Sequence, residues 1–512
     1  MKRLVATALG SGLLLAAGTA AAVPCSGRPT DPAGGAGYSY GAAEVKTFDS
    51  TSIRVHYATS GTHAPALTTT RADLVPDSVA LTGQIADTAL AKYAAMGFKA
   101  PPSDSACTSN GGDGKIDLYL VAFAGADGTT VPEACTGAVC SSFLLVESTF
   151  AGRGYPTVTE GFETVVAHEL FHAVQNAYDH DMDRFWAEGS AQWAMKSVYP
   201  GLTDFENQLP AFFKDNTRSL DTQPSGVTAG FLYGSAVWPL FLTLKHGPDT
   251  VKLVLEAEAL GATSLIAVDA VAKSKGSSLA QDMPLFGAWN AATKALAAAD
   301  GYPDAAKYPG VKIEALTDGV TGITSGLPYF AYRGTLDAAK QITLETDAAR
   351  NSGVAVPIEG GKPVLAKAQP LPAVLAGDVL VVVAGTTVKK TDAPFTLHLA
   401  EPDPGSSGSS GASGSSGSSG SSGTPTSITC PDDLNPPTCD AASEYCIFKK
   451  TTRSTGGVVT VGQCVKKPAN CTDCPCATAD APTAFTRVGG GCKSATVLCS
   501  SKNGAITVEC QK

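Results

Sequence analysis

The sequence His168-Glu169-Leu170-Phe171-His172, with Trp186-Ala187-Glu188-Gly189-Ser190-Ala191 after it, carries the strongest structural signal in this chain. Two histidines four positions apart on a helix lie about 40° apart around its axis, so both imidazoles project from one face. This spacing suits two ligands of a tetrahedral Zn²⁺, with a third protein ligand supplied from elsewhere and a fourth position left for water. Glu169 adjoins the first histidine and is placed to act as a general base on that water.

The residues around the two histidines predict that they lie on a buried helix. Thr157 and Glu160 form a capping-box pattern, and no proline follows up to His172. The alternative is a core helix with two satisfied histidines and a surface glutamate. Three of only seven histidines fall between positions 168 and 180, which favours a metal site. Apolar residues recur at helical spacing at Phe162, Val165, Val166, Leu170, Phe171 and Val174.

Two residues compete for the third ligand position, Glu188 and His180. The helical extension of a metzincin would place glycine at 175 and histidine at 178, where this chain has Gln175 and Tyr178, so that class is excluded. His180 lies in a polar run typical of a loop, whereas Glu188 begins a predicted helix whose small residues would allow close helix packing. We favour Glu188. The alternative for Glu188 is an exposed first-turn carboxylate that faces the helix dipole.

These motifs resemble those of the gluzincin metallopeptidases, and more narrowly those of a group of secreted bacterial metalloproteases. The narrower resemblance covers roughly residues 45–300 and includes stretches similar to residues 53–57, 112–120 and 233–239. It implies an α+β zincin-like domain that hydrolyses peptide bonds, with Zn²⁺ at His168, His172 and Glu188 and with Glu169 as the base. The chain departs from the thermolysin pattern at Gln192, where an aspartate is usual; a glutamine there could still bind a ligand histidine. No Gly-x-Met-Glu-Asn stretch is found, so we favour an endopeptidase over an aminopeptidase.

Tyr233 and one strand complete the predicted catalytic site. In aminopeptidase-like gluzincins, a tyrosine on a helix downstream of the third ligand donates its phenol to the developing oxyanion. The resemblance assigns that role to Tyr233, on a predicted helix over residues 230–244. The alternative is a packed tyrosine whose hydroxyl binds backbone. Residues 142–148 are predicted to form the edge strand that pairs with the peptide substrate.

Composition predicts an exported protein. Lys2 and Arg3, the apolar run over residues 4–17 and Ala20 to Ala22 are typical of a secretory signal peptide. No other stretch approaches eighteen consecutive apolar residues, the usual minimum for a membrane span. A formal net charge of −10 argues against nucleic acid and anionic membranes as partners. We therefore expect a secreted protein, and the resemblance to metallopeptidases implies a peptide or protein substrate.

The cysteines and composition divide the chain into five sections. They are a signal peptide (1–22), the metallopeptidase domain (23–305), a small β-sandwich (306–402), a Gly/Ser-rich linker (403–427) and a disulfide-rich module (428–512). All fourteen cysteines are predicted to form disulfides. Cys135 with Cys140 would leave Cys25 with Cys107, although spacing does not fix the connectivity. Residues 471–476 have zinc-like spacing, but disulfides are favoured there, and the glycine-rich residues 110–117 predict a turn rather than a calcium loop.

Two other functions are compatible with these patterns. The chain could be a non-catalytic exported adhesin or surface-binding protein that retains a zinc-holding fold, with the C-terminal module binding substrate or a surface. It could also be a latent enzyme in which residues 23–45 act as a propeptide and Cys25 caps the zinc. An intact Glu169 favours catalysis, because a binding protein has no need of a general base.

Overall fold

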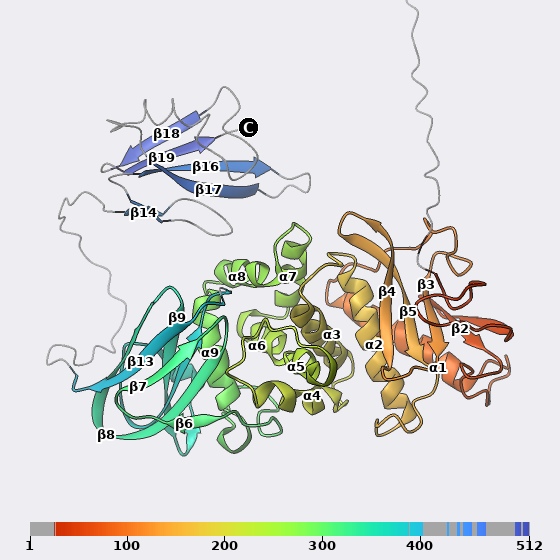
Figure 1. Cartoon of the computed structure of the whole chain (residues 1–512), viewed down its shortest axis with the longest axis horizontal. Helices are drawn as coiled ribbons and strands as arrows, with labels where there is room; N and C mark the ends of the chain where they lie inside the picture. The colour runs from red at the N-terminus through yellow and green to blue at the C-terminus, as the bar shows by residue number, and fades with distance from the viewer. Residues whose placement is uncertain are drawn as a thin grey trace, which may run out of the picture.

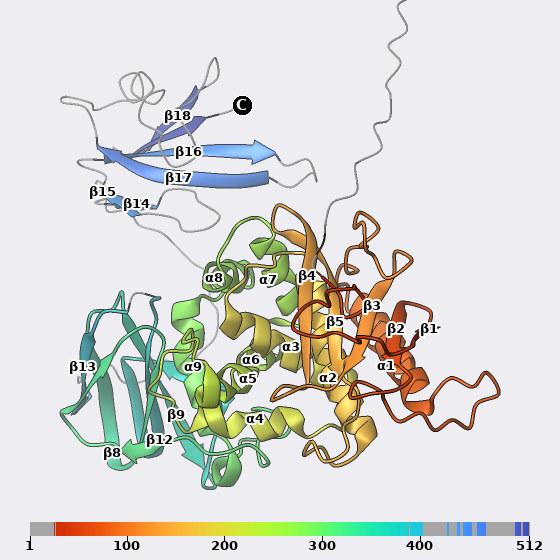
Figure 2. The same cartoon turned by 45° about the vertical axis from the view of Figure 1, so that its right-hand side comes forward.

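The computed structural model describes residue 25, residues 27–388 and 390–402, and strand segments of the C-terminal region (427–429, 438–440, 444–452, 458–466, 497–502 and 505–510). The predicted signal peptide, residues 471–476 and nearly all of the Gly/Ser-rich linker lie outside the described residues. The described part is a mixed α/β protein (Figures 1 and 2).

A five-stranded sheet opens the chain, in the order β1-β2-β3-β5-β4. Strands β2, β3 and β5 are parallel, and β1 and β4 are antiparallel at the two edges. Both faces are buried, so the inner strands carry continuous apolar runs. The strands are β1 (Val45–Asp49), β2 (Ile53–Ala58), β3 (Ile116–Val121), β4 (Gly128–Thr136) and β5 (Val139–Glu147).

Different segments of the chain pack on the two faces of this sheet. Helices α1 (Asp77–Ala95) and α2 (Val158–Gln175) pack on the face that carries Leu118 and Leu120 of β3. The segment before β1 covers the opposite face, where Tyr40 packs with Tyr119. The prediction that residues 142–148 form the edge strand was wrong, because β5 lies between β3 and β4 and the edge strand beside α2 is β4.

Seven helices follow α2 in the described chain: α3 (Arg184–Val198), α4 (Asp204–Phe213), α5 (Gly230–Gly234), α6 (Val237–His246), α7 (Thr250–Glu258), α8 (Ser264–Ser274) and α9 (Leu279–Ala291). Helix α3 begins four residues before Glu188, so Glu188 lies one turn inside it rather than at its start. The helix predicted over 230–244 is divided into α5 and α6 at Ser235 and Ala236. Gly189 lies against Ser235, where an added Cβ would come within 2.7 Å of Oγ, which confirms the predicted close packing at that position.

One described helical stretch, Gly226–His246, is long and apolar enough to cross a membrane by length and composition alone. Its most apolar window is 56% buried, and core helices of folded domains pass the same test, so it is weak evidence of a span. Trp238, Phe241 and Leu242 from this stretch are part of the apolar core.

The second sheet lies against α9. Its strands are β6 (Ile313–Ala315), β7 (Val320–Thr324), β8 (Tyr329–Thr346), β9 (Asn351–Glu359), β10 (Lys362–Pro363), β11 (Gln369–Pro370), β12 (Ala373–Gly385) and β13 (Ala393–Ala400). They form one hydrogen-bonded sheet, in place of the two packed sheets of the predicted sandwich, because the long β8 pairs with β12 along its first part and with β13 along its last. One apolar core runs from the first sheet through the helices to this sheet. Gly287 permits the contact, since a Cβ there would come within 2.8 Å of Val382.

The described C-terminal segments are β-strands. They are β14 (Ser427–Thr429), β15 (Thr438–Asp440), β16 (Glu444–Thr452), β17 (Val458–Lys466), β18 (Val497–Lys502) and β19 (Ala505–Cys510), with a sheet order of β17-β16-β19-β18. A disulfide joins Cys439 to Cys464. The predicted pairs Cys25–Cys107 and Cys135–Cys140 are confirmed. These bonds are consistent with an extracellular protein.

Candidate metal centre

Helix α2 presents His168 and His172 toward helix α3. Its start is fixed by Thr157, whose hydroxyl accepts from the backbone N–H of Glu160 at 3.1 Å, as the capping-box pattern predicts. The helix then runs unbroken to Gln175, and its apolar residues pack in the core against α1 and the sheet. Packing of α2 on α3 brings Glu188 to the two histidines across the helix interface.

The three predicted ligand atoms lie at the corners of a small triangle. The two Nε2 atoms of His168 and His172 are 3.1 Å apart, and Oε2 of Glu188 is 3.3 Å from the first and 3.5 Å from the second. Zn–N and Zn–O bonds of about 2.0–2.2 Å in a tetrahedron place ligand atoms about 3.3–3.5 Å apart. The triangle therefore has the dimensions of one face of a zinc coordination tetrahedron.

Two glutamines fix which ring nitrogen of each histidine carries hydrogen. Gln192 donates from Nε2 to the carboxylate of Asp204, so its Oε1 faces Nδ1 of His168 at 3.2 Å. Gln175 donates from Nε2 to the carbonyl of Ala187 at 2.8 Å, so its Oε1 faces Nδ1 of His172 at 2.7 Å. An amide oxygen only accepts, hence both Nδ1 atoms must donate. In the neutral histidines both Nε2 lone pairs then point to the triangle, which is the tautomer that a metal requires.

Electrostatics in this triangle call for a cation. Two Nε2 lone pairs and a carboxylate oxygen are all acceptors, and at these distances they repel one another unless a proton or metal lies between them. Burial favours neutral His172, but its hydrogen bond and charge interaction with Glu188 outweigh that effect and raise the pKa of His172 to about 9. Burial likewise opposes ionisation of Glu188, yet hydrogen bonds from both histidines hold its pKa well below the usual range. The donor set, its spacing and its charge therefore fit Zn²⁺.

Glu169 lies next to this triangle, on the side of strand β4. It is only 7% exposed, and Oγ of Thr130 donates both to its carboxylate at 2.9 Å and to its backbone carbonyl at 2.7 Å. Gly128 packs directly on it, since a Cβ there would come within 2.8 Å of Cγ of Glu169. Strand β4 thus contacts both the backbone and the side chain of the candidate base.

Tyr233 closes the other wall of the site. Its ring centroid is 5.8 Å from that of His168. Burial, together with the negative charges of Glu188 and Glu169, raises its pKa far above 10, so the phenol keeps its proton. Cavities of about 300 and 360 Å³ lie on either side of this wall, and both are lined by Gly128, Glu169 and Tyr233. A larger cavity of about 650 Å³ lies beside α1, and none of these three residues lines it.

His180 is not brought to the ligand triangle. Its Nδ1 lies 3.1 Å from the carbonyl of Ala138, and the potential metal ligands near it are Cys135 with Cys140 or Asp179 with Asp181. Those two cysteines are joined in a disulfide. His180 does line the cavity of about 300 Å³. Cys25 is bonded to Cys107, so it does not cap the site, as one form of the latent-enzyme hypothesis suggested.

Sequence reasoning missed the contributions of Gln175, Thr130 and Gly128. Gln175 entered only as evidence against a metzincin, although a residue three positions after His172 shares its helix face and could have been recognised as its partner. Thr130 and Gly128 meet Glu169 only through tertiary structure, and a polar segment gives no local signal of that contact. Neither the known protein-family models nor the curated proteins match this chain.

Proposed function

We propose that this chain is a secreted zinc-dependent endopeptidase of the gluzincin type, with a zincin-like catalytic domain. The observation that supports this best is the arrangement of the two histidines beside Glu169. Gln192 and Gln175 set the tautomers of His168 and His172, and both Nε2 atoms face Glu188 at the spacing of zinc ligands. A structural zinc site would be expected to have four protein ligands. Three ligands beside a buried carboxylate are instead typical of a catalytic site.

Each residue of the site has a part in the proposed reaction. His168, His172 and Glu188 would hold Zn²⁺, which when bound acts as a Lewis acid on the scissile carbonyl and lowers the pKa of water toward about 7. Glu169 accepts the proton from the attacking water and passes it to the leaving amine. The contact with Thr130 keeps its carboxylate oriented during both transfers.

Tyr233 donates its phenolic proton in a hydrogen bond to the oxyanion that develops on the scissile carbonyl. Its raised pKa supports this role, because a donor must keep its proton at the working pH. A donor of this kind contributes roughly 3 kcal/mol to transition-state stabilisation.

The substrate peptide is proposed to pair with β4. The outer edge of β4 faces away from β5, and Gly128, Thr129, Thr130 and Pro132 line the cavity next to Glu169. An extended peptide added to such an edge gains main-chain hydrogen bonds and side-chain pockets on alternate residues. The cavities on both sides of Glu169 leave room for substrate residues before and after the cut bond, which supports endopeptidase over aminopeptidase activity. By analogy with other tethered modules, the C-terminal strands would bind substrate or a surface.

Cleavage of a peptide library, read by mass spectrometry, tests this proposal. The purified protein is compared with its Glu169→Gln variant after the zinc content of both has been measured. Cuts made by the first and absent from the second support a zinc peptidase and give its subsite preferences. Zinc in both proteins with no cuts in either would favour the exported binding protein, and absence of zinc from both would overturn the metal assignment.

A further inference from the structure

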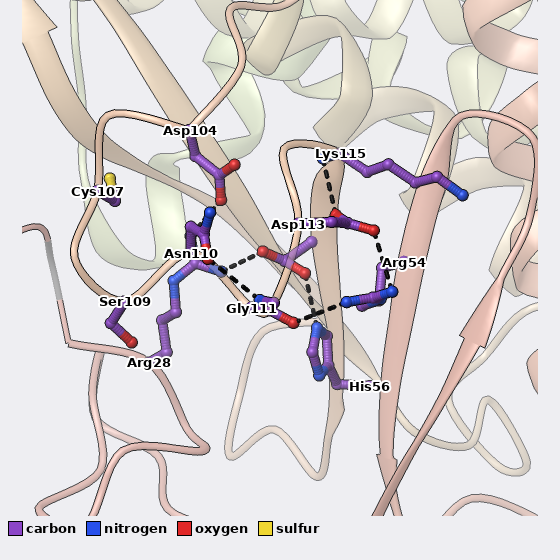
Figure 3. Close-up of polar contacts among 12 residues, drawn as sticks. Arg28, Arg54, His56, Asp104, Cys107, Ser109, Asn110, Gly111, Asp113 and Lys115 are labelled. Carbon is purple, nitrogen blue, oxygen red and sulfur yellow. Dashed lines mark hydrogen bonds and ion pairs between the residues drawn. The ribbon is translucent and has the colours of Figure 1, made fainter. Parts of the chain in front are cut away.

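Arg28 is a fully buried arginine that joins the segment before β1 to strands β3 and β4 and to the loop that contains Asp104. Its Nη2 lies 2.6 Å from Asp104 and 2.6 Å from Glu133, and its Nη1 contacts Asp117 and lies 3.0 Å from the hydroxyl of Tyr119. All three carboxylates are at most 2% exposed. Figure 3 shows the end of the Arg28 side chain beside Asp104, and His56 contacts Asp117 at 2.6 Å.

Glu133 belongs to β4, the strand that contacts Glu169. The β4–β5 ladder is regular from Gly128 to Pro132, and its register then shifts so that Glu133 and Ala134 stand opposite Ser141 alone. Val131 packs with Tyr119 on the face that the segment before β1 covers, and Glu133, two residues further along β4, points to the same face by strand alternation. Arg28 lies over the ring of Tyr119 and binds the carboxylate of Glu133 there, at the bulge.

We infer that Arg28 is a positioning residue for the substrate-binding edge, because its ion pair with Glu133 fixes the bulge of β4 and thereby the strand that lines the cleft and contacts Glu169. This inference rests on the proposed peptidase function for its meaning in catalysis. Its structural content, that the segment before β1 holds β4 in place, can be tested without any cleavage.

The charges explain why one cation would control the strand. Asp104, Asp117 and Glu133 are buried within reach of one guanidinium, and burial unsupported by a counter-ion disfavours ionised carboxylates. Without Arg28 they must take up protons or separate. Asp117 is in the interior strand β3, which is paired on both sides, whereas β4 is paired on one side only. Of the two carboxylates that belong to the sheet, Glu133 is therefore the one that can move away, and its movement would draw the bulge of β4 outward.

A covalent tie holds Arg28 in reach of the strand. Cys25, three residues before it, is bonded to Cys107, which belongs to the same loop as Asp104. The ring closed by this disulfide includes β1, β2 and α1, so the segment is part of the folded domain. This argues against the hypothesis that residues 23–45 are a removable propeptide.

Hydrogen exchange of β4 tests the inference, with four variants of the full chain. Glu133→Ala removes only the ion pair between Arg28 and β4, since Arg28 retains its contacts with Asp104, Asp117 and Tyr119. We expect hydrogen exchange of the amides in β4 to become about tenfold faster in this variant. Glu133→Gln keeps an acceptor for Arg28 and should give a smaller rise. Arg28→Met should give at least the rise of Glu133→Ala. Arg54→Met is the matched control. Arg54 pairs with Asp113 (Figure 3) and with Asp49, and among the described residues it makes no hydrogen bond or ion pair with β4.

The outcomes separate this inference from the proposed function. Faster exchange confined to β4 and its neighbour β5 in Glu133→Ala, with Arg54→Met unchanged there, supports it even if no peptide is cleaved. Unchanged exchange of β4 in Glu133→Ala, or an equal rise in Arg54→Met, overturns it even if the wild type is an active peptidase. If Arg28→Met fails to fold, the two Glu133 variants still test whether the ion pair holds β4 in place. In an active enzyme, Glu133→Ala should raise KM for a long peptide about tenfold and leave zinc content at the wild-type value.

Discussion

Replacement of Gln192 by leucine should weaken zinc binding while leaving all three ligands in place. Gln192 is 2% exposed and links Nδ1 of His168 to the carboxylate of Asp204. Leucine has a similar volume but cannot accept the Nδ1 hydrogen, so the imidazole loses both its fixed tautomer and its fixed ring orientation. Loss of such an outer partner typically costs 10–100-fold in metal affinity, or about 1.4–2.8 kcal/mol of binding free energy.

The assay is titration of the metal-free protein with zinc in competition with a fluorescent chelator. Gln208→Leu is the matched control, because Gln208 lines the same cavity as Gln192 and, in the part of the chain that the structure describes, makes no hydrogen bond to His168 or His172. Unfolding curves for both variants show whether the fold is intact. A dissociation constant unchanged in Gln192→Leu, or raised equally in Gln208→Leu, would refute the argument that Asp204 and Gln192 set the donor atom of His168.

Three further predictions concern the base, the edge strand and a buried acid. Glu169→Gln should keep zinc and lose roughly 10²–10⁴-fold in peptide cleavage, the usual contribution of a general base; a variant that cleaves as fast as the wild type contradicts the role. Gly128→Ala places a Cβ 2.5 Å from Cγ1 of Val165, so we expect denaturant unfolding to show a loss of about 1–3 kcal/mol. Gly201→Ala, which meets no atom within 4 Å, should be close to neutral, and equal losses would contradict the packing argument. Burial raises the pKa of Glu258 to about 8, so the folded state retains a proton that the unfolded chain releases above about 4.5. The free energy of unfolding should therefore fall as the pH rises between these two values. In thermal melts at a series of pH values, Glu258→Gln should reduce that dependence.

The metal centre was the most predictable part of the molecule because its signals are local. The spacing of His168 and His172 on one helix, and the capping pattern at Thr157, depend only on neighbours in sequence. The edge strand was not predictable in the same way. Residues 142–148 have the apolar run of a strand, but such a run indicates burial on both faces, which places β5 inside the sheet. The true edge, β4, contains a proline and polar residues, as edge strands often do, and these suggest a loop.

The burial of Arg28 was also not predictable from the sequence. A single arginine in a stretch rich in glycine and proline has no periodicity, and most arginines of that kind are exposed. Its burial follows from three carboxylates on separate segments, and their meeting depends on the strand order and on the loop that carries Asp104. The single second sheet was likewise not predictable from the sequence, because it depends on the long β8, which pairs with β12 along its first part and with β13 along its last.

The ligands and the base are held by different parts of the structure, and this separation has consequences for variants. His168, His172 and Glu188 project from two helices that pack together in the core, and their orienting glutamines are bound on those helices and at the start of α4. Glu169 lies on α2 beside His168, but its contacts with Thr130 and Gly128 come from β4, a strand that is paired on one side only. A change at Gln192 should therefore reduce zinc affinity with little effect on β4, and a change at Glu133 should alter peptide binding with little effect on zinc. If both variants changed both quantities by the same factor, the strand and the metal centre would have to form one cooperative unit, and the role inferred for Arg28 would extend to the metal itself.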